Sequence, residues 1–129
     1  MTNQEIFNKM YTGVVTQGAF SFSGGMCRYR LDGLKCAAGH LIPDDKYNDT
    51  IEGCSVLAFD GTPSKITELF VSLGFNTNQI LFINQAQVIH DRNAEHGTMR
   101  DFISEMADLA QDYGLVVPKI EPKLIAGNG

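Results

Sequence analysis

The first part of the chain carries apolar residues at intervals of three and four positions, the spacing of one face of an α-helix. The residues that recur in this way are Ile6, Phe7, Met10, Val14 and Val15. Thr2 and Glu5 form a capping box just ahead of them, and Gly18 is of a type that commonly ends a helix. The pattern predicts a helix that starts at about Asn3 and stops at Gly18, with its apolar face in the core.

The same spacing predicts three further helices in the second half of the chain. The first runs over 63–73, with Thr62 as its N-cap and a proline at its first position. The second runs over about 78–93, and the third opens with Thr98 and Asp101 and ends at Gly114. The stripes expected on these helices are Ile66, Leu69, Phe70 and Leu73 in the first, Ile80, Leu81, Asn84 and Val88 in the second, and Phe102, Met106, Leu109 and Tyr113 in the third.

Asp32-Gly33 is a two-residue turn signal, and it predicts a β-hairpin. The predicted cross-strand pairs are Leu31 with Leu34, Tyr29 with Cys36 and Cys27 with Ala38. Because side chains alternate along a strand, these paired residues share one apolar face. The opposite face, which we call the basic face, would carry Arg28, Arg30 and Lys35.

Together these elements predict a single α+β domain, mostly helical, with about four helices around one antiparallel β-hairpin. We expect the domain to span residues 1–117, with residues 115–117 packed back against its body. Residues 118–129 contain two prolines and a Gly-Asn-Gly end, which predicts an irregular C-terminal tail. Residues 54–59 form a short apolar run whose pattern fits either a strand or a helix.

The composition fits a globular protein and disfavours some classes of function. Hydrophobic residues make up 43% of the chain, and its net charge of −5 disfavours non-specific nucleic-acid binding, which depends on basic residues. No run approaches the roughly 20 apolar residues that span a bilayer, and the first residues lack the pattern of a signal peptide. Three cysteines without such a signal indicate reduced thiols, so we expect a cytoplasmic protein.

A motif around the predicted hairpin resembles a known group of proteins. It consists of Cys27-x-Tyr29-Arg30, Gly33-x-Lys35-Cys36-Ala37-x-Gly39-x-Leu41-Ile42-Pro43-Asp44 and Tyr47, followed by Glu52-Gly53 and His90-Asp91. With it the chain resembles, from the N-terminal helix to about Leu115, a group of small proteins encoded by tailed phages and prophages. The resemblance implies a phage origin and a place in the host cytoplasm, and it implies no reaction. In that group the position of His40 is often Cys or Ala, which argues against an obligatory ligand there.

Cysteine and histidine residues of the chain offer an alternative, a zinc site. The four candidate ligands are Cys27, Cys36, His40 and His90, with Cys54 as a further candidate. Their spacings are loose and contain no Cys-x-x-Cys knuckle. We therefore favour the interpretation that the cysteines are small buried hydrophobes and that the protein has no cofactor.

A catalytic thiol is a further alternative, with Cys36 as nucleophile and His40 or His90 as base. A nucleophilic cysteine must be accessible and have electropositive surroundings. Cys36 is expected on the apolar face of the hairpin, which disfavours both conditions. The pattern therefore favours a non-catalytic protein over an enzyme.

The basic face is the stronger candidate for function. Arg28 and Arg30 lie two residues apart, so on a strand they point the same way and could clamp a phosphate or carboxylate together with Lys35. The competing interpretation is a solvated hairpin face, or internal pairing with Asp44, Asp45 or Glu52.

We therefore expect a non-catalytic accessory protein of phage type. It would bind a host or phage protein, or a small anionic ligand, through the basic face, and interference with host defence is one role that a phage origin suggests. Nucleic acid and membrane are not expected partners, and whether copies of the chain associate stays open. The alternative is a small zinc-binding protein or a Cys/His-based enzyme.

Overall fold

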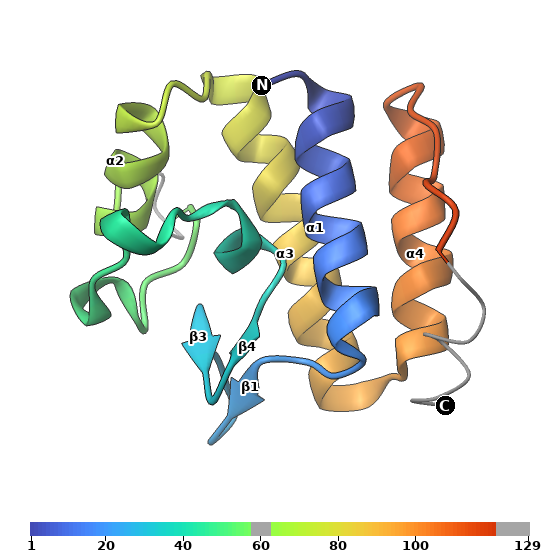
Figure 1. Ribbon diagram of the computed structural model, residues 1–129, viewed down its shortest axis with the longest axis horizontal. Helices are drawn as coiled ribbons and strands as arrows, with labels where there is room; N and C mark the ends of the chain where they lie inside the picture. Colours follow the sequence, from blue (N-terminus) through green and yellow to red (C-terminus); the bar gives the residue numbers. More distant parts are fainter. Residues whose placement is uncertain (58–62, 121–129) are drawn as a thin grey trace.

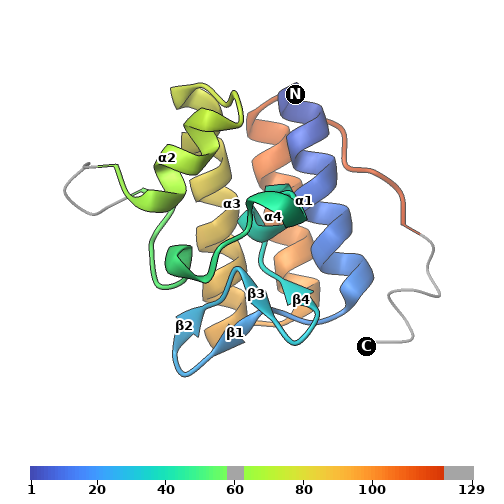
Figure 2. The ribbon, with the colours of Figure 1, turned by 60° about the vertical axis from the view of Figure 1, so that its left-hand side comes forward.

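The computed structural model describes residues 1–57 and 63–120, and four α-helices lie within them (Figure 1). They are α1 (Asn3–Gln17), α2 (Lys65–Ser72), α3 (Thr77–His96) and α4 (Met99–Asp112). Helices α1, α3 and α4 run side by side, α2 lies apart from them, and the short strands lie at one end of the bundle (Figure 1, Figure 2). The predicted α+β, mostly helical fold is confirmed.

Each of these helices begins with a capping box. The predicted boxes at Thr2 and Thr98 are confirmed, and Gly18 ends α1 in the left-handed conformation with φ 72°. The predicted start of α2 is wrong by two residues. The Ser64 hydroxyl accepts a hydrogen bond from the Thr67 N–H and so caps a helix that begins at Lys65. Thr62, the expected cap, lies outside the described residues.

Helix α3 buries a different face from the one that the sequence predicts. Leu81 and Val88 of the expected stripe are 45% and 49% exposed. The buried residues of this helix are Ile80, Phe82, Ile83, Ala86, Gln87, His90 and Asn93. Because residues 80–83 are all apolar, the sequence pattern does not define which face of this helix points inward. Packing of α3 against α1 and α4 determines the buried face.

The Asp32-Gly33 turn forms as predicted. It joins β3 (Arg30–Leu31) to β4 (Leu34–Lys35) in an antiparallel pair. The cross-strand pairs are Arg30 with Lys35 and Leu31 with Leu34, which is the predicted register. Both turn residues have positive φ, 49° at Asp32 and 85° at Gly33, as a tight turn of this hand requires.

The hairpin is shorter than predicted, and the described residues contain two hairpins instead of one. Strand β2 (Met26–Cys27) pairs with β1 (Phe22–Ser23), so Cys27 does not pair with Ala38. The predicted pair of Tyr29 with Cys36 is also missing from the described ladder. The Glu52 carboxylate accepts hydrogen bonds from the backbone N–H groups of Tyr29 and Arg30 instead, at 2.8 and 3.1 Å.

Residues 36–41 connect the β3–β4 hairpin to the core. Cys36 is fully buried, as its predicted inward orientation requires. The 3-10 turn η1 (Ala38–Leu41) follows and packs against α1 and α3. A Cβ atom at Gly39 would lie 2.4 Å from the Tyr29 carbonyl oxygen, a clash that glycine avoids. The Lys-Cys-Ala-x-Gly part of the motif therefore has a packing role.

The remaining segments contain little regular structure. Residues 54–57 form neither a helix nor a strand, and 58–59 lie outside the described residues. After α4, the Val116 backbone exchanges two hydrogen bonds of 2.7 and 2.9 Å with the Gln4 side chain, so this segment packs against α1 as predicted. Residues 118–120 are irregular, and 121–129 lie outside the described residues. No described helix is long and apolar enough to cross a bilayer.

Candidate functional site

The basic face is partly neutralised by contacts within the chain. The Arg30 guanidinium lies 2.8 Å from Asp44 Oδ1, donates to the Ile42 carbonyl at 3.1 Å and stacks over the Tyr47 ring at 4.5 Å from its centroid. Lys35 Nζ lies 3.8 Å from the same Asp44 oxygen. Both cations thus share one carboxylate, which is the internal pairing that the sequence offered as the competing interpretation.

Glu52 fixes the surroundings of Arg30. Its carboxylate accepts hydrogen bonds from the backbone N–H groups of Tyr29 and Arg30. It also accepts a hydrogen bond of 2.7 Å from the Tyr47 hydroxyl. Desolvation, together with this hydrogen bond, raises the pKa of Tyr47 to about 12, so its hydroxyl remains a donor. The Arg30 side chain therefore ties the hairpin to the loop that follows η1 and has a structural role.

Arg28 differs from the other two residues of the basic face. It is solvent-exposed, and no ion pair of this side chain is found among the residues that the structure describes. Of the three predicted ligand-binding residues, Arg28 thus presents its charge to solvent, while Arg30 and Lys35 are half-buried.

The four residues of the zinc alternative are divided between two places. His40 lies beside α1, where its Nε2 is 3.2 Å from Gln17 Oε1 and its ring covers Gly13. Burial, with the nearby charge of Lys35, lowers the pKa of His40 to about 4, so the ring is neutral at pH 7. Cys27 and His90 lie elsewhere, in a group whose third member is Asp91.

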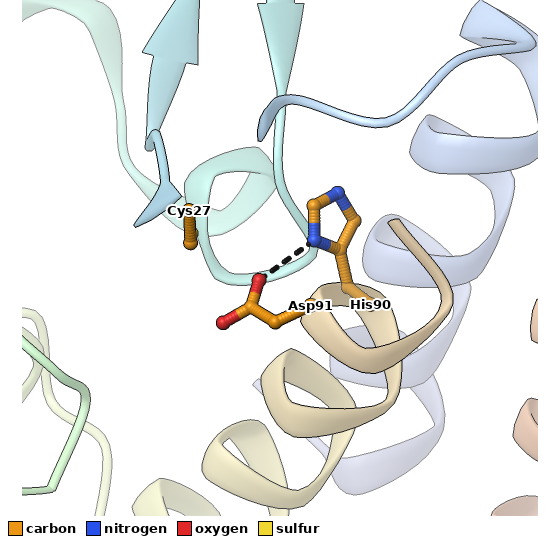
Figure 3. Close-up of side chains that lie close together, drawn as sticks. All are labelled: Cys27, His90 and Asp91. Atoms are coloured by element: carbon orange, nitrogen blue, oxygen red, sulfur yellow. Dashed lines mark hydrogen bonds and ion pairs between the residues drawn. The ribbon is translucent and has the colours of Figure 1, made fainter. Parts of the chain in front are cut away.

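Cys27, His90 and Asp91 bring their ligand-type atoms within 4.8 Å of one another (Figure 3). His90 is fully buried, and its Nδ1 lies 3.0 Å from Asp91 Oδ1. Its Nε2 accepts a hydrogen bond of 3.3 Å from the Ser21 backbone N–H. Because a backbone N–H can only donate, the hydrogen-bond pattern assigns the lone pair to Nε2 and the proton to Nδ1.

Gln87 completes this group, which we call the His90 network. Its Oε1 accepts from the Ala38 N–H at 2.8 Å, and its Nε2 lies 2.8 Å from Cys27 Sγ and 2.7 Å from Asp91 Oδ1. The side chain is only 5% exposed, so these bonds replace contacts with water. Helix α3 is thereby joined to both the first hairpin and η1.

The His90 network engages both the Cys27 thiol and the His90 imidazole. A hydrogen bond with Cys36, burial and the charge of Asp91 all raise the pKa of Cys27, so its thiol stays protonated. Both nitrogens of His90 are engaged, and zinc would need the Nδ1 lone pair that the proton occupies. The arrangement is suited to holding elements together.

The sequence singled out His90 and Asp91 as a pair but did not include Gln87, Ser21 or Asp91 among the site residues. Residues 87, 90 and 91 are separated by three and four positions on α3, so they lie on one helix face. That spacing was available as a signal for Gln87. The contacts with Ser21 and Ala38 join residues 69 and 49 positions apart, and local patterns contain no signal for them.

Comparisons of the chain with protein-family models, with curated protein sequences and with solved structures found no match. The geometry of the basic face and of the His90 network therefore provides the basis for the functional conclusion.

Proposed function

We propose that this chain is a non-catalytic accessory protein of phage type that acts by binding a host or phage protein in the host cytoplasm. The observation that carries the proposal is the internal use of the reactive groups. Both nitrogens of His90 are hydrogen-bonded, and the Cys27 thiol is kept protonated. Because His90 and Cys27 make their hydrogen bonds within the protein, we assign them a structural role and look to the surface for function.

Arg28 is the centre of the proposed contact surface. Since Arg30 and Lys35 already share Asp44, the basic face is poorly arranged to enclose a small anion. A carboxylate on the surface of a partner protein needs less enclosure, and an exposed arginine can bind it through two parallel hydrogen bonds. We therefore favour an acidic surface of a protein partner over a free small anion, and interference with host defence remains the role that a phage origin suggests.

The test is capture of a partner by variants that differ at one exposed arginine. Wild-type protein, Arg28→Glu and the control Arg100→Glu are each immobilised and incubated with host lysate, with and without phage infection. Arg100 is an exposed residue of α4. We expect one partner to be retained by the wild type and by Arg100→Glu and to be lost with Arg28→Glu. Equal capture by all three proteins would contradict a role for the basic face.

Zinc binding is the second candidate, and the distance of 4.8 Å or less within Cys27, His90 and Asp91 favours it. It requires the Nδ1 proton of His90 to leave and the Gln87 contacts to rearrange. Metal analysis of protein purified without chelator separates the two candidates. Stoichiometric zinc, together with a lower melting temperature after chelation, would favour the zinc protein.

A further inference from the structure

A pocket of about 200 Å³ opens between β2, the segment around Cys54 and α3. Its lining includes the Met26, Tyr29, Val56, Asn84, Val88 and Asp91 side chains. Met26 and Val88 are both 49% exposed, so two apolar residues of the lining reach the protein surface. The volume is below the range of about 300–1,000 Å³ that holds drug-sized molecules, and it matches a single small group.

Asp91 provides the charge of this pocket. Among the described lining residues Asp91 is the one aspartate, glutamate, lysine or arginine. Burial raises the pKa of Tyr29, and the pKa of Cys27 is also raised, so both of these side chains stay neutral at pH 7. The neighbouring Arg92 is engaged elsewhere, at 2.5 Å from Glu105. The described part of the lining thus contains a carboxylate without a cation to balance it.

The Asp91 carboxylate is also held in a fixed orientation. Its Oδ1 accepts from His90 Nδ1 and from Gln87 Nε2, at 3.0 and 2.7 Å. Its second oxygen, Oδ2, points away from His90 (Figure 3). The Cys27 thiol is also a hydrogen-bond partner of this carboxylate. The side chain is 36% exposed. Oδ1 is thus anchored in the His90 network, and because a carboxylate has about four acceptor sites, Oδ2 keeps the capacity to accept from a ligand.

We propose that this pocket binds an organic cation, an ammonium or guanidinium group on an apolar stem, with Asp91 Oδ2 as its counter-charge. The Asn84 amide oxygen can accept a further N–H of the cation, and Val56 and Val88 can contact the stem. The inference goes beyond the proposed function, since Arg28 is not among the lining residues of this pocket and the pocket takes the opposite charge. The same chemistry is offered by a lysine or arginine side chain of a partner and by a free small amine.

The test is a titration of the full chain followed by amide NMR, with n-butylammonium and methylguanidinium as probes. We expect saturable shifts at Asn84, Gln87 and Val88, and about tenfold weaker binding to Asp91→Asn, because that variant keeps an oxygen for His90 but loses the charge. Asp108→Asn is the control, since Asp108 is an exposed acid of α4 outside this pocket. Neutral n-butanol separates binding of charge from binding of the apolar stem.

A second variant keeps the test decisive if Asp91→Asn folds poorly. Val88→Lys places an ammonium group at the exposed rim, where it can occupy the site itself, so we expect it to abolish probe binding. Tighter binding of an acetylated and amidated Ala-Lys-Ala peptide than of n-butylammonium would identify a partner side chain as the ligand. The reverse order would identify a free amine. Unsaturable shifts in the wild type, equal binding of butanol, or unchanged binding by Asp91→Asn and Val88→Lys would overturn the proposal.

Discussion

Replacement of Gln87 by methionine tests whether the His90 network stabilises the fold. The substitution preserves the length of the side chain and removes all three of its polar contacts. The Ala38 N–H then lies buried without an acceptor, which costs about 1–3 kcal/mol. The lost hydrogen bond to the Asp91 carboxylate contributes about 1.5–3 kcal/mol more.

Burial of an apolar side chain in place of an amide offsets part of this loss, by about 1 kcal/mol. We therefore expect Gln87→Met to lower the free energy of unfolding by about 1.5–5 kcal/mol. For a chain of 129 residues, an unfolding entropy of about 2.1 cal/mol/K per residue converts this loss into a fall of about 6–18 °C in the melting temperature.

The assay is thermal and urea unfolding of Gln87→Met beside two further variants. Gln87→Glu keeps an acceptor for the Ala38 N–H but places a second carboxylate against Asp91. Because two like charges repel, we expect this variant to be at least as destabilised at pH 7 as at pH 4. Gln111→Met changes an exposed glutamine of α4 and should leave stability within about 0.5 kcal/mol of the wild type. Wild-type stability of Gln87→Met would refute the structural role of the network.

Two further predictions concern the motif. Gly39→Ala should lower the free energy of unfolding by about 1–3 kcal/mol in urea, because its Cβ would lie 2.4 Å from the Tyr29 carbonyl oxygen, and an unchanged midpoint would contradict this close approach. The neutral, half-buried His40 should make the protein less stable in acid, because its pKa is about 4 in the folded protein and about 6.5 for an unperturbed histidine. Its contribution to stability is complete above pH 6.5 and is lost as the pH falls toward 4. At about 1.4 kcal/mol per pH unit the loss has an upper limit of about 3 kcal/mol, and partial exposure should reduce it to about 1–2 kcal/mol. His40→Phe should lack this part of the pH dependence in unfolding curves measured between pH 4 and 7, and an identical slope in both proteins would contradict the assignment.

The parts of the fold that sequence reasoning predicted are those with local causes. The capping boxes at Thr2 and Thr98 and the Asp32-Gly33 turn depend on contacts within four residues, so short patterns contain the necessary information. The length of the hairpin was not predictable in this way. It is set by Glu52, which lies more than 20 positions from Tyr29 and takes the N–H groups at the end of the ladder.

The candidate site shows the same division between local and distant causes. The inward orientation of Cys36 follows from strand alternation, and the structure buries it. The environment of His90 depends on a contact with Ser21 and on which face α3 turns toward the core. The sequence pattern does not predict that face, because residues 80–83 are all apolar. His40 is separated from Cys27 and His90 because its ring covers Gly13 of α1, a contact that no spacing of cysteines and histidines reveals.

The protonation state of His90 tests the central claim most directly. The proposal of binding without catalysis requires both ring nitrogens of His90 to be held by hydrogen bonds within the protein. Nitrogen-15 NMR of the imidazole ring, recorded at pH 7 before and after addition of zinc, distinguishes the two ring nitrogens. The hydrogen-bond pattern predicts a neutral ring with its proton on Nδ1 and unchanged signals when zinc is present. A ring whose Nδ1 lacks the proton, or whose Nδ1 signal moves with stoichiometric zinc, would contradict the account.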